Sequence, residues 1–351
     1  MEKIRVLVVD DSIVVRRVVT EALQALGDIA IVGSASNGRV ALSKMSQLTP
    51  DLVILDIEMP EMDGLTALTH LRQAHPRTPV IMFSSLTELG AQATLEALSR
   101  GASDFFAKPS GGGGLEASRR LIQAELAPAI RALCPRPAAR PETAVVAVPA
   151  PAAPTTACRV DAIAIAASTG GPNALAEVFA ALPADLPVPI LIVQHMPPMF
   201  TQMLAERLAK HSKIPTVEAA SGMLLEPGRA WIAPGNHHLV VARNGPRVVA
   251  RVHQDLPENA CRPSADPLLR SVAGLYGRHA LAVVLTGMGR DGLRGCEAIR
   301  AAGGQVLAQD EASSVVWGMP GFVARAGLAD QVLPLSLLAG ALVRRVKVGR
   351  E

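Results

Sequence analysis

Short apolar runs alternate with longer amphipathic stretches on both sides of a proline-rich segment, and this alternation constrains the fold more than any other feature of the chain. The first 130 residues or so contain five such runs, which read IRVLVV, IAIVGSA, LVILD, VIMFSS and DFFAK. Helix-like stretches lie between them near residues 13–26, 37–47, 64–74 and 88–100. Runs of this length and spacing predict parallel strands joined by right-handed helical crossovers, as in flavodoxin-like folds.

A second pattern of the same kind runs from residue 159 to the end of the chain. Segment 229–253 differs, because apolar and polar residues alternate there around an NGP sequence. That alternation predicts an antiparallel β-hairpin, as a flap or an edge on a mostly parallel, Rossmann-like sheet. Between the two patterns, six prolines within residues 135–154 predict a semi-extended linker. The sequence therefore predicts an α/β protein with two doubly wound domains, at residues 1–130 and 159–348. A linker at residues 131–158 joins them.

The composition argues against several classes of function. The 351 residues carry a net charge of +3 with acids and bases interspersed, so no basic stripe indicates binding to nucleic acid or to a membrane surface. No apolar run reaches the roughly 18 residues of a membrane span, and the N-terminus lacks a signal-peptide pattern. The four cysteines are scattered and form no CxxC pair, which predicts reduced thiols in a cytoplasmic protein.

Five polar residues follow the apolar runs of the first half. Asp10 and Asp11 end the first run and Asp56 ends the third, while Ser84 ends the fourth and Lys108 the fifth. Because the carboxyl ends of parallel strands share one edge of a sheet, we expect these side chains in one crevice. Three carboxylates suit Mg²⁺, which could bridge a phosphoryl group and Asp56 while Lys108 balances the charge and Ser84 hydrogen-bonds the phosphoryl group. Taken one at a time, the aspartates could instead be helix N-caps or loop acids.

Together these residues resemble the receiver domain of two-component response regulators. The resemblance covers residues 1 to about 130 and rests on the stretches VVDDS, LDIEMPEMDG, MFSSLTE and DFFAKPS. It implies that Asp56 accepts a phosphoryl group from a histidine kinase. It also implies that Asp10, Asp11 and Asp56 bind Mg²⁺, helped by the backbone carbonyl of Glu58.

The same resemblance assigns a coupling role to three further residues. It implies that Ser84, Lys108 and Phe105 couple phosphorylation to the opposite surface of the domain. A cis peptide bond before Pro109 is also expected, because it would aim the Lys108 amine into the acidic pocket.

Ser168, His195 and Asp291 each come directly after an apolar run in the second half, the runs being DAIAIAA, PILIVQ and LAVVLTGMGR. In a doubly wound sheet such positions converge on one crevice. A serine, a histidine and an aspartate brought together predict a nucleophilic hydrolase. In that interpretation Ser168 attacks a carbonyl, His195 transfers the proton and Asp291 holds the imidazole. Backbone N–H groups near Thr169 or Met288 could receive the oxyanion.

Other interpretations of these three residues remain open. Ser168 could be a helix cap, His195 a loop residue and Asp291 the N-cap of the next helix. The chain order Ser, His, Asp differs from that of the α/β-hydrolases, and the lack of an HExxH motif argues against a metalloprotease. A non-catalytic regulator, whose second domain binds a partner after phosphorylation, is the main alternative. A DNA-binding regulator is disfavoured, because the second domain is large and strand-rich and has no basic recognition helix.

The whole chain resembles the family of chemotaxis response-regulator protein-glutamate methylesterases. The second-half match covers about 159–348 through AASTGGP, LIVQHMP, IAPGNHHL, CRPSADPLL, LTGMGRDG and WGMPGFVARAG. The resemblance implies hydrolysis of glutamate γ-methyl esters on chemoreceptor helices, with release of methanol, and deamidation of receptor glutamines. It also implies a monomer without a cofactor at the hydrolase site, whose unphosphorylated receiver restrains the hydrolase cleft. Four further residues are candidates for lining the groove that takes the receptor helix, namely His238, Arg262, Ser264 and Asp266.

Overall fold

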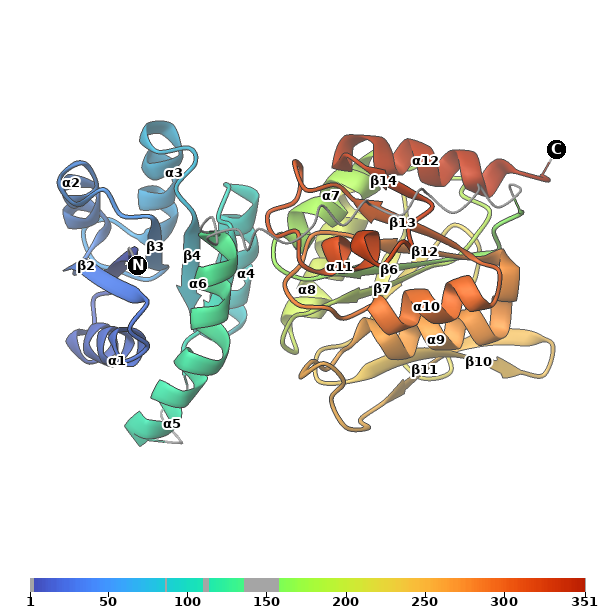
Figure 1. The fold of residues 1–351 in the computed structure, drawn as a ribbon, viewed down its shortest axis with the longest axis horizontal. Helices are drawn as coiled ribbons and strands as arrows, with labels where there is room; N and C mark the ends of the chain where they lie inside the picture. The colour runs from blue at the N-terminus through green and yellow to red at the C-terminus, as the bar shows by residue number, and fades with distance from the viewer. Residues whose placement is uncertain (1–2, 86, 110–113, 136–157, 351) are drawn as a thin grey trace, which may run out of the picture. The chain divides into compact units, whose positions relative to one another are not determined.

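The computed structural model describes residues 3–85, 87–109, 114–135 and 158–350, and these residues form two compact units, one on each side of residues 136–157 (Figure 1). The predicted linker, residues 131–158, therefore lies largely outside the described residues. Its first residues are described, and there the last helix of the first unit continues to Leu133.

The described part of the first unit contains a five-stranded parallel sheet of order β2-β1-β3-β4-β5. This is the flavodoxin-like order expected from the sequence. Strands β3 and β4 are buried along their whole length, which explains why they read as nearly uninterrupted apolar runs. The strand bounds are β1 Ile4–Val9, β2 Ile29–Ala35, β3 Leu52–Asp56, β4 Val80–Ser84 and β5 Asp104–Ala107.

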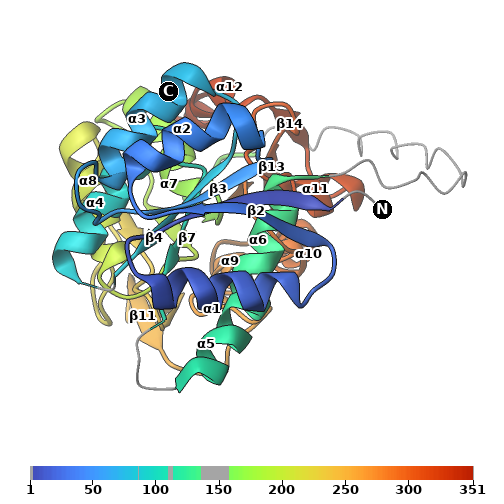
Figure 2. The ribbon, with the colours of Figure 1, turned by 90° about the vertical axis from the view of Figure 1, so that its left-hand side faces the viewer.

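Helices cover both faces of this sheet. Their bounds are α1 Ile13–Gln24, α2 Gly38–Leu48, α3 Gly64–Ala74, α4 Glu88–Ser99, α5 Gly114–Leu121 and α6 Ala127–Leu133. Figure 2 shows α1 and α5 on one face and α2 and α3 on the other. The first four helices each begin at a side chain that accepts a hydrogen bond from the backbone N–H three residues on. These caps are Ser12, Asn37, Asp63 and Thr87.

The described part of the second unit holds a seven-stranded parallel sheet of order β14-β13-β12-β6-β7-β9-β8. The chain starts at the central strand β6, builds outward to β8, and then returns to the other side of β6 with β12. The strand order therefore reverses at β6, and the carboxyl ends of the strands there form the crevice typical of such sheets. The bounds are β6 Ala162–Ala167, β7 Ile190–Gln194, β8 Thr216–Glu218, β9 Ala230–Ile232, β12 Ala280–Val284, β13 Gln305–Gln309 and β14 Gln331–Leu333.

Small side chains on β6 allow a helix to pack closely on the middle of this sheet. Ala162, Ala164 and Ala166 alternate along β6 and join one core with Leu268 and Val272 of α9. Figure 1 shows α9 and α10 below the sheet and α7 and α12 above it. The bounds are α7 Gly171–Ala181, α8 Phe200–His211, α9 Ala265–Tyr276, α10 Leu293–Ala301, α11 Met319–Arg325 and α12 Leu335–Lys347. None of the described helices has both the length and the apolar character that a membrane crossing requires.

The predicted hairpin forms over only part of residues 229–253. Strands β10 (His238–Asn244) and β11 (Arg247–His253) pair antiparallel around a two-residue turn. They form a sheet of their own and bury Leu239, Val241 and Ala250 in the core that contains α9, so the hairpin is not an edge of the parallel sheet. The beginning of the segment belongs instead to β9 of the large sheet.

Candidate active site and acidic cluster

The carboxyl ends of β1 and β3 bring Asp10, Asp11 and Asp56 together, with one carboxylate oxygen of each within 4.8 Å of the others. Asp10 and Asp56 are buried, whereas Asp11 is exposed. The Nζ atom of Lys108 lies 2.9 Å from Asp10 Oδ2 and 2.7 Å from Asp56 Oδ2. The structure therefore gathers four of the predicted residues, and the oxygen donors of the three carboxylates fit a hard divalent cation.

Burial dominates the electrostatics of this cluster. It raises the pKa of Asp56 to about 6, although hydrogen bonding to Lys108 acts in the opposite direction, and the neighbouring charge of Asp10 raises it further. The same burial opposes the charge on Lys108, but the two carboxylates outweigh it and raise the pKa of that amine. The backbone N–H of Glu58 donates to Asp56 Oδ1 at 3.4 Å. A cation here would relieve a repulsion that Lys108 alone balances only in part.

The hydroxyl of Ser84 is hydrogen-bonded to backbone carbonyls. Its Oγ atom donates to the carbonyl of Gly90 at 3.0 Å, on the first turn of α4. Among the described residues, no hydrogen bond joins Ser84 Oγ to Asp56 or to Lys108. The backbone N–H of Lys108 nevertheless donates to the Ser84 carbonyl at 2.7 Å, so the two residues are neighbours across β4 and β5.

The prediction of a cis peptide bond before Pro109 is wrong. Within the ranges that the structure describes, the one cis bond precedes Pro263. Lys108 reaches both buried carboxylates with a trans bond after it, so its amine needs no cis geometry to enter the pocket. Phe105 is partly buried on β5.

Ser168, His195 and Asp291 follow β6, β7 and β12, next to the reversal in strand order. The pairing of β6 with β7 extends to Ala167 and Gln194, and the N–H of His195 donates to the Ala167 carbonyl at 3.1 Å. The Nε2 atom of His195 lies 2.7 Å from Asp291 Oδ2. The structure thus joins the histidine to the aspartate and puts the serine at the end of the adjacent strand.

Ser168 lies in a tight turn between β6 and α7. Gly170 precedes the helix with a φ of +78°, and the N–H of Gly171 donates to the Ser168 carbonyl at 2.7 Å. A Cβ atom on Gly171 would lie 2.0 Å from Gln194 Oε1 and 2.9 Å from the Ala167 Cβ, so a larger residue here would displace the Gln194 side chain. Gln194 Nε2 donates to the carbonyls of Ser168 and His195 at 3.0 and 3.3 Å, which ties the two loops together. No hydrogen bond in the described chain links Ser168 Oγ to His195, and such catalytic contacts often tighten only when substrate binds.

The amino end of α9 holds the Asp291 carboxylate. The backbone N–H groups of Ala265 and Asp266 donate to it at 2.6 and 3.2 Å, and the Ser264 hydroxyl donates at 2.7 Å. Burial disfavours the charge on Asp291, but its hydrogen bond with His195 and these donors outweigh burial and hold its pKa below the usual range. Asp291 is therefore ionised at neutral pH.

Different side chains face the two ring nitrogens of His195. Asp291 faces Nε2, and the sulfur of Cys261 lies 3.6 Å from Nδ1. Burial disfavours the charged imidazolium, but the contacts with Asp291 and Cys261 outweigh it, so the pKa of His195 lies above its ordinary value. Because Asp291 holds Nε2, proton exchange with a nucleophile would have to use Nδ1, the nitrogen that Cys261 contacts. The sequence did not indicate Cys261, which lies in a loop without strand or helix periodicity.

A cavity of about 280 Å³ lies beside His195 and is lined in part by Cys261 and Met288. Of the two predicted oxyanion positions, Met288 therefore borders the cavity. Thr169 is buried, and its carbonyl accepts a hydrogen bond from the Thr286 hydroxyl at 3.0 Å.

Three residues expected to line a groove for a receptor helix are buried instead. His238, Ser264 and Asp266 are at most 1% exposed, so this expectation is wrong for them. Their polar atoms bond inside the protein, as Ser264 does with Asp291. Arg262 remains partly exposed.

Comparison with known proteins identifies both units. Residues 6–119 match the response regulator receiver domain model, and residues 163–342 match the model described as CheB methylesterase. The chain belongs to the CheB methylesterase family. One CheB relative, the protein-glutamate methylesterase/protein-glutamine glutaminase of Trichodesmium erythraeum, is 49% identical over 351 residues, covering 99% of this chain and 100% of the relative. A protein of Pseudomonas aeruginosa with the same name, numbered 2, is 46% identical and covers 97% of each chain.

A solved CheB structure matches the second unit. The crystal structure of the Thermotoga maritima CheB methylesterase catalytic domain is 38% identical, with a TM-score of 0.52, and the match covers 53% of this chain and 99% of that chain. Membership of the CheB family makes the chain a response regulator with a hydrolase domain, and it does not favour the non-catalytic alternative.

Proposed function

We propose that this chain is a protein-glutamate methylesterase and protein-glutamine glutaminase whose activity depends on phosphorylation of Asp56. The observation that carries this proposal is the 2.7 Å contact between His195 and Asp291 at the strand end beside Ser168. The substrates are glutamate γ-methyl esters and particular glutamines on chemoreceptor helices. The protein would act in the cytoplasm as a monomer, without a nucleic-acid partner or insertion into the membrane.

The two reactions share one mechanism of acyl transfer. Ser168 Oγ attacks the γ-carbonyl carbon, and His195 Nδ1 takes the hydroxyl proton while Asp291 stabilises the imidazolium. The imidazolium then gives this proton to the leaving group, which departs as methanol from an ester or as ammonia from an amide. Water hydrolyses the Ser168 ester by the same route and leaves a glutamate. Backbone N–H groups of Thr169 or Met288 would stabilise the oxyanion.

Asp56 is the proposed acceptor of a phosphoryl group from a histidine kinase. Asp10, Asp11 and Asp56, together with the backbone carbonyl of Glu58, would hold Mg²⁺. When bound, Mg²⁺ supplies positive charge that offsets the negative charge of the phosphoryl group during transfer. The three clustered carboxylates support this assignment.

Lys108 and Ser84 would report the phosphorylated state. The Lys108 amine already contacts the Asp56 carboxylate and would balance the added charge. The Ser84 hydroxyl would have to leave the Gly90 carbonyl to reach a phosphoryl oxygen, and this rotation would alter the beginning of α4. Phe105 on the neighbouring strand would move with it and carry the change to the domain surface.

Labelling with phenylmethanesulfonyl fluoride tests the nucleophile. We expect the reagent to modify Ser168 in the full chain, as located by mass spectrometry of peptides. The His195→Gln variant should lose most of this labelling because it lacks the base, and Ser212→Ala should label like wild type. An unmodified Ser168 in active wild-type protein would overturn the assignment and favour the binding-module alternative.

Acetyl phosphate with Mg²⁺ tests the acceptor. Wild-type protein should incorporate phosphate, Asp56→Asn should not, and Asp185→Asn, an exposed control in the other unit, should behave like wild type. A chelator should abolish incorporation. Equal incorporation by Asp56→Asn, or incorporation that persists in the chelator, would contradict the corresponding part of the proposal.

A further inference from the structure

A tight turn between β11 and α9 touches both members of the His195–Asp291 pair. Glu258 and Cys261 exchange two backbone hydrogen bonds of 3.2 and 2.8 Å across it. The two central residues, Asn259 and Ala260, both have positive φ values of 53° and 60°, as a type I′ turn requires. Cys261, at the end of the turn, contacts the His195 imidazole, and Asn259, in its middle, donates to the Asp291 carboxylate.

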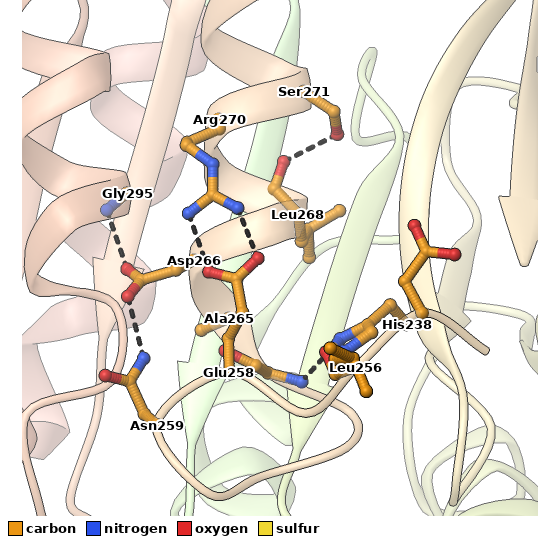
Figure 3. A network of polar contacts seen from close by, with 12 residues as sticks. His238, Leu256, Glu258, Asn259, Ala265, Asp266, Leu268, Arg270, Ser271 and Gly295 are labelled. Carbon is orange, nitrogen blue, oxygen red and sulfur yellow. Dashed lines mark hydrogen bonds and ion pairs between the residues drawn. The ribbon is translucent and has the colours of Figure 1, made fainter. Parts of the chain in front are cut away.

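Helix α9 fixes the position of this turn. Arg270 donates two hydrogen bonds to the Glu258 carboxylate, at 2.6 and 3.0 Å (Figure 3). The same helix presents its amino end to Asp291. The turn and the catalytic carboxylate therefore share one rigid support.

The amide of Asn259 lies between two buried carboxylates. Its Nδ2 atom donates to Asp291 Oδ1 and to Asp266 Oδ2, both at 2.8 Å. The other oxygen of Asp266 accepts from the N–H of Gly295 at 2.7 Å, as Figure 3 shows. Asp266 and Asp291 are 1% and 2% exposed, so with Asn259 in place this amide supplies hydrogen bonds that water would otherwise make. Both hydrogens of one –NH₂ group thus separate two like charges.

We propose that Asn259 is a positioning residue of the hydrolase, anchored by Asp266, which orients the Asp291 carboxylate so that Oδ2 faces His195. This inference rests on the proposed roles of His195 and Asp291. Asn259 and Ser264 both hold Oδ1, and the carboxylate therefore cannot rotate without breaking two side-chain hydrogen bonds. Asparagine suits the position, because it supplies two donors and tolerates a left-handed backbone.

The charges around the pair set the direction of a pH effect. A carboxylate at position 259 would add negative charge beside Asp291 and favour the charged form of His195. The proton-accepting form of His195 would then appear only at higher pH. The described titratable and charged groups that face the pair and its supporting residues come from the turn, the hairpin, α9, α10 and the loop before α10. They are Glu258, Cys261, His238, Asp266, Arg270, Arg290, Arg294, Cys296 and Glu297.

Two variants of Asn259 distinguish a role in positioning Asp291 from a role in folding alone. Asn259→Gly removes the amide and is compatible with the positive φ, whereas Asn259→Asp keeps the side-chain shape and replaces the donor by an acceptor. Asn244→Ala, in the exposed end of the hairpin, is the matched control. Each variant is made in the full chain and kept at saturating acetyl phosphate. The readouts are kcat and KM for methanol release, the pH profile of kcat/KM and the NMR titration of the His195 imidazole.

The proposal predicts a distinct result for each variant. Asn259→Gly should lose roughly 10–100-fold in kcat with KM nearly unchanged, by analogy with other side chains that orient a catalytic ligand. Asn259→Asp should move both the acid limb of the pH profile and the His195 titration to higher pH, so that part of its activity returns in alkaline buffer. Asn244→Ala should match wild type in every readout.

Other results would overturn the proposal. A lowered melting temperature of both Asn259 variants with unchanged kcat and His195 titration would make Asn259 merely structural. A raised KM with unchanged kcat would make it a substrate-binding residue. If wild-type protein releases no methanol, the proposed function fails by itself, and the His195 titration of Asn259→Asp still decides whether Asn259 acts on the pair.

Discussion

Asp291 is the residue on which the contacts of the hydrolase site converge. The Ser264 hydroxyl and the Asp266 N–H donate to Oδ1, while Oδ2 accepts from the Ala265 N–H and also faces His195. This arrangement keeps a buried carboxylate ionised, because helix N–H groups and the Ser264 hydroxyl supply the compensating positive ends of dipoles. The site therefore depends on the charge of Asp291 as well as on its shape.

The Asp291→Asn variant tests this dependence. The amide –NH₂ group of the new asparagine would face at least one of the donors that now bond to the carboxylate. The neutral amide also lacks the negative charge that stabilises the His195 imidazolium. We expect kcat for methanol release to fall roughly 10³–10⁴-fold. The exposed control Glu177→Gln on α7 should retain wild-type activity. A loss of less than tenfold in a folded Asp291→Asn protein would rule out the proposed role.

The raised pKa of His195 predicts the pH dependence of the reaction. In the proposed mechanism only the neutral imidazole can accept the Ser168 proton, and contacts with Asp291 and Cys261 stabilise the charged form. Activity should therefore increase as the pH rises through the pKa of His195, with a midpoint above the ordinary value of 6.5. The measurement is kcat/KM against pH with saturating phosphodonor. An acid limb centred below that value would contradict the electrostatic account.

Sequence reasoning located some of these residues and missed others for physical reasons. Ser168, His195 and Asp291 follow apolar strands, and the geometry of a parallel sheet is enough to predict that such positions converge. Asn259 and Cys261 come from a type I′ turn that an ion pair joins to α9, and no local pattern in the sequence encodes that non-local contact.

At the scale of elements, close packing between helices shapes the hydrolase unit. Gly295 of α10 lies against Leu269 of α9, and a Cβ atom there would approach the Leu269 Cβ to 2.4 Å. The same glycine donates its N–H to Asp266, which anchors Asn259. The spacing of the two helices and the position of the site are therefore linked through one small residue.

Two glycine substitutions in this unit should change stability in opposite directions. Gly295→Ala forces α9 and α10 apart and should lower the free energy of unfolding by about 1–3 kcal/mol. Gly274→Ala, on the exposed side of α9 with nothing within 4 Å of the added atom, should raise it by about 0.5–1 kcal/mol. Urea unfolding of the full chain measures both changes. Equal effects of the two substitutions would contradict the packing argument.

The elements themselves were largely predictable from periodicity. The receiver strands are parallel, and their apolar runs give their positions along the chain, most clearly for the fully buried β3 and β4. The predicted hairpin included Ala230–Ile232, which belongs to the large sheet instead. The composition of these three residues fits any short strand, and their pairing with β7 and β8 is non-local. The inward position of Ser264 and Asp266 was missed for a related reason, since polar residues at the start of a helix are usually exposed.

At the scale of the whole molecule, each unit contains its own sheet, core and site. The residues around His195 and Asp291 all belong to the second unit, as do the donors that hold them. Every hydrogen bond described above for His195 and Asp291 comes from a residue of the second unit. Phosphorylation of Asp56 should therefore act by changing access to a formed site rather than by assembling it.

A fragment beginning near residue 155 tests this view. We expect it to fold and to release methanol from methylated receptors without a phosphodonor, because the whole hydrolase site lies within it. Acetyl phosphate should not change its rate. A folded fragment that is inert, as judged by circular dichroism together with the methanol assay, would mean that the receiver contributes to the site itself.

The most direct test of the central claim is methanol release from methylated chemoreceptor membranes by the full chain. The assay compares wild type with Ser168→Ala, each with and without acetyl phosphate and Mg²⁺. We predict release by wild type that increases with the phosphodonor, and a loss of at least about 10³-fold in Ser168→Ala under both conditions. Release by Ser168→Ala at the wild-type rate would contradict the role of Ser168 as the nucleophile. Wild-type release that does not change with the phosphodonor would contradict regulation by phosphorylation of Asp56.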